Sequence, residues 1–402
     1  MGNIFDVAIV GCGTAGTFAA YKIAKDHPHI KCVIFEAGRG PQKRRFQMQG
    51  FLGLLPNSDG KLYTDDIDNL KKLCKQKITN TAFQWFKDNI AKTCNTKVIE
   101  DTLPYKLPLK KIKNSGFTFS KQNFIQIVPH EIHSLSKVIS QSLNSNTNIT
   151  QNFDEEIESI QYKNKQFVIT SYSGSQTICK KLILASGRSG WRATDKLFND
   201  FGLTSKDRIV RFGVRAELPA NSLKEYNRSN GIISNNELEI GPLSWFGQCV
   251  PEDHYDMVLS SFRANESRWA SDKVSFNVLG KHNVENSVKY LDRIGQLTFI
   301  LTDERVLKEK IGALLTKRAK VSKLLEYDWL IEAFSKIEAF MPEIAKGSFY
   351  TPTLLPIVSK IKLTPKLQTE HKDLILAGET TGYSGLLFAI LSGVIAGDSA
   401  SL

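Results

Sequence analysis

The sequence predicts an α/β fold with two domains, one built on a parallel β-sheet and the other on a mostly antiparallel sheet. Apolar runs near both ends of the chain are each followed by glycines and a helix-like pattern, which is typical of strands in a parallel sheet. From Ile209 onward, apolar and polar residues alternate over several runs, which is typical of antiparallel strands. The length of 402 residues suffices for two hydrophobic cores.

The first predicted strand and helix enclose a glycine-rich turn at the start of the chain. Val7 to Val10 is an apolar run of strand length. Gly11, Gly13 and Gly16 follow with GxGxxG spacing before a helix-like segment. In such a turn the first glycine permits the sharp bend, the second lets a pyrophosphate approach the backbone, and the third lets the helix pack closely on the strand. The N–H groups at the start of the helix then favour bound phosphate.

A second apolar run ends in an acidic residue. Cys32 to Phe35 is predicted to be a strand, and Glu36 follows it directly. At this point of a dinucleotide site a carboxylate accepts hydrogen bonds from a ribose diol and repels a 2′-phosphate. Strand, turn, helix, second strand and acidic residue together predict a Rossmann-like domain that binds a dinucleotide. A glycine-rich turn with no ligand is the alternative interpretation.

Three strand-like runs in the middle of the chain predict a β-meander that returns to the parallel sheet. They are Glu156 to Tyr162, Gln166 to Tyr172, and Gln176 continuing to Ala185. Ser186 and Gly187 come directly after the last run. This second glycine-bearing strand end is positioned to approach the same dinucleotide.

The last fifty or so residues return to the first domain. Asp373 to Ala377 is a predicted strand, and Gly378, Gly382 and Gly385 lead from it into a long apolar helix. Glu379 supplies an acceptor, and the helix N-terminus directs its positive end toward the ligand. A domain that binds only a nicotinamide dinucleotide needs no such element. A flavin does, because its N1 and C2 carbonyl gain negative charge on reduction. This element therefore favours FAD.

These elements predict a discontinuous first domain and a second domain inserted into it. The first comprises residues 1–50, 120–205 and 360–402, and the second comprises residues 51–119 and 206–359. No second GxGxxG follows a strand in the middle of the chain, so no dedicated NAD(P)H domain is predicted. NAD(P)H remains a candidate transient reductant.

Two proline-containing stretches interrupt the regular pattern of the second domain. Lys106 to Phe119 is short and broken by prolines, and we predict a β-like conformation for it. Met341 to Pro356 is predicted to be irregular because it is also rich in proline.

Charge and cysteine content narrow the function classes. The net charge is +12, and basic clusters lie at Lys43–Arg45, Lys106–Lys113 and Lys308–Lys323. These clusters would attract anionic substrates or nucleic acid, but no nucleic-acid module is recognisable, so a solvated basic surface is the favoured interpretation. Six scattered cysteines without a CxxC pair indicate free thiols and a reducing compartment. With a first strand almost at the N-terminus and only a short late apolar stretch, Leu386–Ile395, we expect a cytoplasmic protein without a membrane span.

Several of these motifs carry a family resemblance. GCGTAG with Glu36 at the start, and LAGETTGYSGLLFAILSGVIAG at the end, resemble the glutathione-reductase-type FAD flavoproteins. A bacterial family of uncharacterised FAD-dependent dehydrogenases is more similar still, through SDGKL at Ser58–Leu62, PHEIHSLSKVI at Pro129–Ile139, and the segment Gly187–Leu218. The chain departs from that family before SDGKL, where it has FLGLLPN. It also departs at Phe246–Asp253, where a CxCPGG-like pattern is replaced by FGQCVPED.

The resemblance implies bound FAD, with the SDGK segment near the isoalloxazine ring. The predicted cofactor contacts are Gly11, Gly13, Thr14, Ala15, Gly16, Glu36, Ala37, Gly38, Arg45, Ser58, Asp59, Gly60, Lys61, Ser186, Gly187, Gly378, Glu379, Gly382, Tyr383, Gly385 and Leu386. No metal site is predicted.

The predicted reaction is hydride or electron transfer between FAD and a small molecule bound between the two domains. The candidate catalytic residues are Lys61, as a cation near the flavin, His130, before an amphipathic helix, and Arg215, as an anion clamp. A surface lysine and a structural histidine are the alternative interpretations of the first two. An FAD-dependent tRNA-modifying enzyme and a non-catalytic FAD protein that serves as a redox sensor are the alternative functions.

Overall fold

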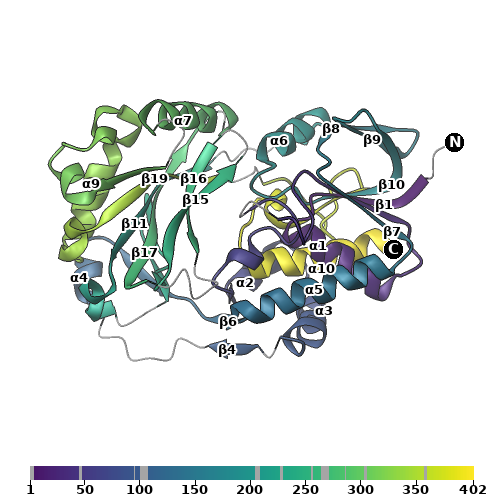
Figure 1. The fold of residues 1–402 in the computed structure, drawn as a ribbon, viewed down its shortest axis with the longest axis horizontal. Helices are drawn as coiled ribbons and strands as arrows, with labels where there is room; N and C mark the ends of the chain where they lie inside the picture. Colours follow the sequence, from purple (N-terminus) through teal and green to yellow (C-terminus); the bar gives the residue numbers. More distant parts are fainter. Residues whose placement is uncertain are drawn as a thin grey trace. The chain divides into compact units, whose positions relative to one another are not determined.

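The structure is a computed structural model of the chain. It describes residues 4–44, 48–94, 96–99, 107–203, 209–226, 230–254, 257–263, 271–285, 287–302, 306–356 and 360–402. The chain folds into two compact units, which are considered separately (Figure 1). Unit 1 comprises Met1–Val98, Phe124–Asp207 and Ile357–Leu402, and unit 2 comprises Ile99–Asn123 and Arg208–Pro356.

Within its described residues, unit 1 is organised around a seven-stranded sheet. Its strand order is β7–β2–β1–β10–β9–β8, and β20 also pairs with β10. The parallel strands are β1 (Ile4–Val10), β2 (Cys32–Glu36), β7 (Ile149–Phe153), β10 (Gln176–Leu184) and β20 (Leu374–Leu376). The antiparallel meander is formed by β8 (Ile157–Lys163), β9 (Gln166–Ser171) and β10. Every residue of β2 is buried, because parallel strands are covered on both faces.

The helices of unit 1 include α1 (Thr14–Asp26), α5 (Pro129–Ser145), α6 (Trp191–Asp200) and α10 (Leu386–Ser401). Figure 1 shows α1, α10 and α5 running side by side, and α1 contacts both of the others. The backbones of α1 and α10 approach closely. A Cβ atom at Gly393 would lie 2.2 Å from the Ala15 carbonyl oxygen, and one at Gly397 would lie 2.6 Å from the Ala19 carbonyl oxygen. Glycine at these two positions therefore lets the helices touch.

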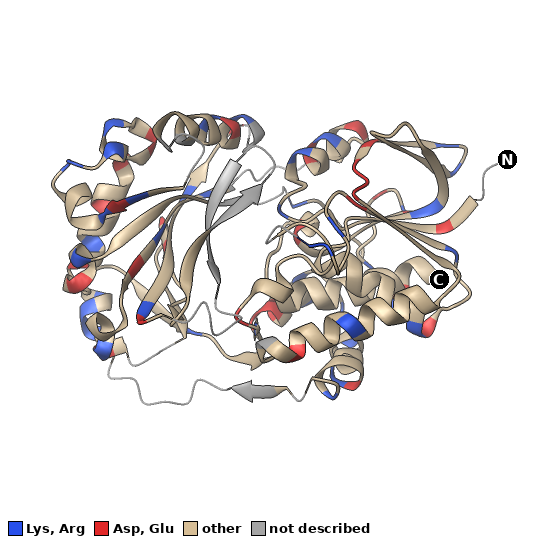
Figure 2. Ribbon diagram, in the orientation of Figure 1, with Lys and Arg blue, Asp and Glu red and all other residues tan. Residues whose placement is uncertain are grey.

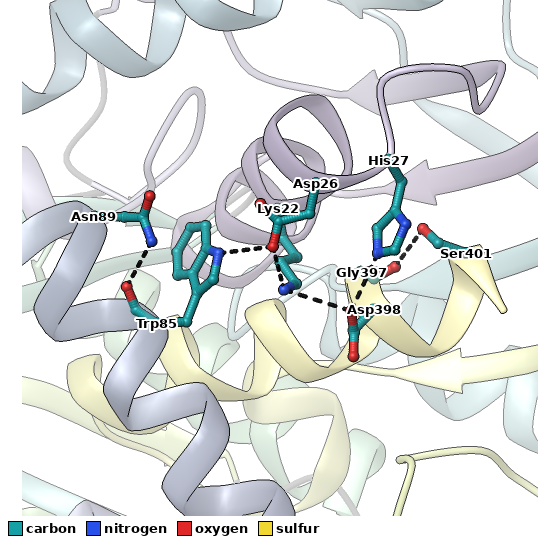
Figure 3. Close-up of polar contacts among 8 residues, drawn as sticks. All are labelled: Lys22, Asp26, His27, Trp85, Asn89, Gly397, Asp398 and Ser401. Carbon is teal, nitrogen blue, oxygen red and sulfur yellow. Dashed lines mark hydrogen bonds and ion pairs between the residues drawn. The ribbon is translucent and has the colours of Figure 1, made fainter.

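A polar cluster joins the C-terminal ends of the same two helices (Figure 3). Lys22 is buried, and its Nζ lies 2.5 Å from Asp26 Oδ2 and 3.4 Å from Asp398 Oδ1. Trp85 donates its indole N–H to Asp26 Oδ2 at 3.0 Å, and His27 Nε2 lies 3.1 Å from Asp398 Oδ1. Because these side chains come from three helices, the cluster fixes the helices to one another.

We expect Lys22→Met to lower the free energy of unfolding by about 2 kcal/mol, because two carboxylates lose the cation they share. Asp26 and Asp398 keep side-chain exposures of 34% and 48%, so solvent limits the loss. Urea unfolding followed by circular dichroism measures the effect. Lys25→Met, on the exposed side of the same helix, is the control. Equal changes in the two variants would contradict a stabilising role for the cluster.

Residues 51–98 differ from the predicted domain boundaries. The prediction assigns them to the second domain, but they pack in unit 1. They form η1 (Leu55–Asn57), β3 (Lys61–Tyr63), α2 (Asp66–Leu73), α3 (Gln76–Phe86) and β4 (Lys97–Ile99), and β3 pairs with β6 (Phe124–Gln126). Both α2 and α3 contact α10, and Leu70 and Phe86 belong to the same hydrophobic core as Ile9. Their amphipathic pattern predicts helices without indicating which core they join.

Unit 2 contains, in its described residues, an eight-stranded antiparallel sheet. Its strand order is β18–β19–β11–β17–β13–β12–β5, with β14 also paired to β17. The strands are β5 (Thr118–Lys121), β11 (Ile209–Pro219), β12 (Gly231–Ser234), β13 (Leu238–Ile240), β14 (Ser244–Trp245), β17 (Lys273–Asn283), β18 (Leu307–Lys310) and β19 (Ser348–Pro356). A separate hairpin is formed by β15 (Gln248–His254) and β16 (Met257–Arg263). The helices are α4 (Leu109–Asn114), α7 (Ser287–Thr302), α8 (Ile311–Leu315) and α9 (Asp328–Glu338). The sheets of the two units confirm the predicted fold class.

Two predictions about proline-containing stretches of unit 2 are wrong. The stretch predicted to be β-like contains α4, which begins directly after Pro108, and only its end belongs to a strand. The stretch predicted to be irregular contains β19. The register between β19 and β11 shifts between Gly213 and Arg215, opposite Pro352. A proline is tolerated at such a bulge because its missing N–H removes no regular ladder bond.

The basic clusters around residues 110 and 315 both belong to unit 2. Figure 2 shows acidic residues interspersed among the basic ones on the helices of this unit. This mixture favours the interpretation of a solvated surface. All six cysteines lie in the described part of the chain and are free thiols. In that part, no helix combines the length and apolar character needed to cross a membrane.

Candidate functional site

The three glycines of the motif have different structural roles in the turn after β1. Gly11 has a φ of +96°, and a Cβ atom there would lie 2.4 Å from the Ala185 carbonyl oxygen. A Cβ atom at Gly16 would lie 1.8 Å from the Gly11 carbonyl oxygen. Gly13 differs from both: its φ of −65° suits any residue, and the nearest atom to an added Cβ is the Gly53 Cα, 4.0 Å away. Neither backbone conformation nor packing explains glycine at position 13, whereas the approach of a ligand does.

Helix α1 directs its N-terminus at this turn. Gly13 is the N-cap, and the N–H groups of Thr14 and Ala15 lie in the first turn, where no intrahelical acceptor exists. The first turn holds no acidic side chain that would compete for these groups. Thr14 Oγ1 donates to the Leu52 carbonyl at 2.8 Å, and Leu52 N donates to the Cys12 carbonyl at 2.9 Å. The predicted residues therefore form a position suited to an anion, with the Leu52 segment fixed beside it.

Glu36 holds the neighbouring loop together. Its carboxylate is buried at the end of β2, where Oε2 accepts a hydrogen bond from Cys12 N at 2.6 Å. Oε1 accepts from Gly38 N at 2.8 Å and from Gly50 N at 3.1 Å. A carboxylate accepts up to about four hydrogen bonds, so one position remains for a ribose hydroxyl. The predicted ribose acceptor thus also has a structural role that the sequence does not reveal.

Ala37 and Gly38, the predicted cofactor contacts after Glu36, lie in different surroundings. Ala37 is partly exposed beside Glu36. A Cβ atom at Gly38 would lie 2.5 Å from Gly50 N, so packing alone requires this glycine. Arg45, the other predicted contact of this loop, lies outside the described residues.

The structure brings the strand ends of β10 and β20 together through an ion pair. Arg188 Nη2 lies 2.8 Å from Glu379 Oε1, and Arg188 Nε donates to Oε2 at 3.3 Å. Ser186 Oγ lies 2.7 Å from Thr194 Oγ1, which anchors the start of this turn. Gly187 has a φ of +61°, and no atom lies within 4 Å of an added Cβ. The prediction identified Glu379 as an acceptor but not Arg188, the residue that orients it.

The segment before α10 contains three glycines with positive φ angles. Gly378, Gly382 and Gly385 have φ values of +66°, +81° and +125°. A Cβ atom at Gly378 would lie 2.8 Å from the Ala15 Cβ, so this turn lies against the start of α1. The ring of Tyr383 lies 5.8 Å from that of Phe388. Leu386 then begins α10. The predicted contacts at the start and at the end of the chain are therefore neighbours within unit 1.

The start of α10 contacts a carboxylate from another helix, which was not predicted from the sequence. Asp66, the first residue of α2, is buried, and its Oδ2 accepts a hydrogen bond from Phe388 N at 3.3 Å. A Cβ atom at Gly385 would lie 2.3 Å from Asp66 Oδ1. Burial raises the pKa of Asp66 to about 7, although hydrogen bonds from the Phe388 and Leu387 amides act in the opposite direction. Its signal in the sequence is the acidic pair in YTDDID, ahead of an amphipathic helix.

The SDGK turn packs against the segment before α5. Ser58 Oγ accepts a hydrogen bond from Gly60 N at 3.1 Å, and Ile127 N donates to the Gly60 carbonyl at 3.0 Å. Gly60 has a φ of +74°, and its added Cβ would lie 1.9 Å from the Ile127 carbonyl oxygen. Two of the segments that carry the family resemblance therefore lie together, and β3, which follows the turn, contacts α10.

The three candidate catalytic residues occupy different surroundings. Lys61 Nζ lies 3.5 Å from Asp59 Oδ2 and 5.3 Å from the centre of the Phe124 ring, with the side chain 15% exposed. His130 is exposed in the first turn of α5. Arg215 lies on β11 in unit 2. Lys61 therefore belongs to the segment that packs on α10, and the position of His130 resembles that of a surface residue.

Arg215 is at the centre of a buried polar network in unit 2. Its Nε donates to Ser275 Oγ at 3.1 Å, Nη1 donates to Asn277 Oδ1 at 3.0 Å, and Nη2 donates to Ser244 Oγ at 3.4 Å. These partners are neutral and come from β17 and β14. These three hydrogen bonds fix the orientation of the buried guanidinium.

Glu217, two residues after Arg215 on β11, is also buried. Its Oε1 lies 2.9 Å from Lys273 Nζ and accepts a hydrogen bond from the Tyr350 hydroxyl at 3.0 Å. Burial by itself would raise the pKa of Glu217, but the Lys273 ammonium and these hydrogen bonds hold it below its usual value. The described residues contain no group of three or more histidine, cysteine or acidic side chains arranged to hold a metal ion.

Comparisons with known proteins give no family assignment. No protein-family model matches the chain, and no curated protein matches its sequence. Solved structures that match over nearly the whole chain include the halogenase PltM, a flavoprotein/dehydrogenase from Cytophaga hutchinsonii, and PqsL from P. aeruginosa in complex with 2-aminobenzoylacetate. Their identities are 14%, 14% and 12%, with TM-scores of 0.46, 0.43 and 0.42. The matches cover 98%, 99% and 97% of this chain and 67%, 78% and 84% of the others. These three TM-scores are below 0.5, so the matches carry no argument about the function of this chain.

Proposed function

We propose that the protein is an FAD-dependent oxidoreductase of the glutathione-reductase type that acts on a small molecule. The observation that carries this proposal is Gly13. It has ordinary backbone angles and no neighbour that would clash with a side chain, yet it lies at the N-terminus of α1, where N–H groups have no intrahelical acceptor. A pyrophosphate that approaches this backbone explains both features.

The predicted residues of unit 1 form two groups that suit the two halves of an FAD molecule. The Gly11–Gly16 turn would hold the pyrophosphate, and the remaining acceptor position of Glu36 would take the ribose of the adenosine half. The glycine segment ending at Gly385, together with the N-terminus of α10, would hold the flavin half. When bound, FAD supplies the group that accepts and donates two electrons. The positive end of α10 and the ammonium of Lys61 would stabilise negative charge there.

For the substrate, we infer an anionic group recognised by Arg215. The inference is supported by the burial of this guanidinium and by the hydrogen bonds that fix its orientation. An NAD(P)H molecule, itself an anion, remains the candidate transient reductant. No observation in the described residues favours the RNA-modifying alternative or the redox sensor.

We expect Gly13→Val to lose at least tenfold in FAD affinity, which is about 1.4 kcal/mol, because the new side chain would fill the space the pyrophosphate needs. The stability of the FAD-free protein should change by no more than about 1 kcal/mol, since only the N-cap preference is affected. Quenching of flavin fluorescence on titration with the purified FAD-free protein measures the affinity, and thermal unfolding measures the stability. Gly16→Val is the matched control in the same turn. It should lose stability first, because its Cβ would lie 1.8 Å from a carbonyl oxygen.

Two results would contradict the proposed function at different points. A wild-type protein that is colourless, releases no FAD on denaturation and does not bind added FAD would exclude a flavoprotein. A Gly13→Val variant that binds FAD as tightly as the wild type would leave the flavoprotein possible but exclude this turn as its phosphate site.

A further inference from the structure

Asp66 and Gly385 form a matched pair at the start of α10. The carboxylate reaches the first-turn amides of the helix, and Oδ2 accepts from Phe388 N at 3.3 Å. Any side chain at position 385 would occupy the place of Oδ1, 2.3 Å from its Cβ. Gly385 also has a φ of +125°, which side chains rarely adopt. The chain therefore admits one carboxylate, from α2, to the helix end where the proposed flavin half would be held.

The charge of this carboxylate depends closely on its surroundings. Ionised Asp66 is stabilised by the positive end of α10 and by the amides it accepts from, but its burial opposes ionisation. Asp65, the N-cap residue of α2, acts on Asp66 and opposes its ionisation further. On α10 the charged residue is Asp398, at the opposite end, and on α3 it is Lys77, which is exposed. Asp66 is thus close to balance between its two protonation states near neutral pH, where its pKa is about 7.

We propose that Asp66 takes up a proton when a flavin held at the start of α10 is reduced, and releases it on reoxidation. The inference rests on the proposed function. Two electrons and one proton added to the oxidised flavin leave it with one negative charge, located at N1 and the C2 carbonyl. Two negative groups at one helix end repel each other, so Asp66 binds a second proton, taken from water. The electrons come from the reductant, one proton goes to the flavin, and one goes to the Asp66 carboxylate.

This role predicts an additional proton in the redox equilibrium above pH 7. We expect the midpoint potential of the FAD-loaded wild type to fall more steeply with pH than that of Asp66→Asn. The difference corresponds to a tenfold change in the equilibrium constant per pH unit, or about 30 mV for a two-electron couple. Titration with dithionite against reference dyes between pH 7 and 9 measures it. Asp68→Asn, at an exposed position of the same helix, is the matched control and should keep the wild-type slope.

The same variant separates a proton-binding role from a purely structural one. If Asp66 only caps α10, Asp66→Asn loses stability while the slope of potential against pH equals that of the wild type, and this result overturns the proposal. If Asp66→Asn does not fold, the wild type decides alone, because a slope of only one proton per two electrons between pH 7 and 9 also overturns it. FAD loading is measured first. A wild type that takes up no FAD fails the proposed function and this inference with it, whereas a loaded protein with equal slopes fails this inference alone.

Discussion

Replacing Glu36 by glutamine is expected to lower the free energy of unfolding by about 3 kcal/mol, because a buried carboxylate that accepts three backbone hydrogen bonds loses its charge and one of its acceptors. The carboxylate accepts from Cys12 N at Oε2 and from the amides of Gly38 and Gly50 at Oε1. Glutamine must place its NH₂ group at one of these two positions. In either orientation a donor then faces a buried N–H group, so at least one amide is left without an acceptor.

Thermal and urea unfolding of the FAD-free protein measure this loss without any ligand. Glu158→Gln, on the exposed side of β8, is the control, since it makes the same chemical change on a side chain in solvent. We expect the control to stay within about 0.5 kcal/mol of the wild type. If Glu36→Gln were as stable as the control, the carboxylate would not organise the loop between Gly38 and Gly50, and its role would be limited to ligand binding.

The residues that could be predicted from the sequence are those whose signal is local. The turn from Gly11 to Gly16 is predictable because three glycines, a strand and a helix follow one another directly, and each glycine has a separate physical reason. Glu36 is predictable by its position at the end of the second strand. Neither prediction depends on knowing which distant segment packs nearby.

The residues that were missed act through distant partners. Asp66 contacts Phe388, which is 322 positions away in the sequence, and Arg188 pairs with Glu379, which is 191 positions away. A single acidic or basic residue in a turn carries no information about such a partner. The same reason explains why residues 51–98 were assigned to the wrong domain: an amphipathic helix predicts that it has a core to face, and only packing on α10 decides which one.

The strand β19 was missed for a different reason. A proline inside a strand pattern normally indicates an edge or an interruption, and the stretch Met341–Pro356 was predicted to be irregular because it is rich in proline. In the structure β19 lies between β18 and β11, and a bulge accommodates the proline: Thr351 and Pro352 of β19 lie opposite the single residue Val214 of β11. The extra residue of this bulge lies on β19 itself, but a bulge is defined by its pairing with β11, which the local pattern around Pro352 does not show.

Gly393→Ala is expected to lower the free energy of unfolding by about 3 kcal/mol, because its new methyl group would overlap the backbone of α1. The added Cβ would lie 2.2 Å from the Ala15 carbonyl oxygen, and backbone atoms cannot rotate away as a flexible side chain can. The helices would have to separate. Such a separation would also move Ala15 away from the turn at Gly378, where the two ends of the proposed FAD site meet. We therefore expect this variant to lose FAD affinity together with stability, in contrast to Gly13→Val, which should lose affinity alone.

The control for this substitution is Gly312→Ala, within helix α8 of unit 2. There the nearest atom to an added Cβ is the Ala345 carbonyl oxygen at 3.1 Å, so a shift of a few tenths of an ångström is enough. In both helices alanine is preferred over glycine by about 1 kcal/mol, so the difference between the two variants isolates the overlap. Chemical unfolding measures both. A Gly393→Ala variant that kept wild-type stability would mean that α1 and α10 can move apart without a loss in the free energy of unfolding. The close helix contact would then not be what holds the two glycine turns together.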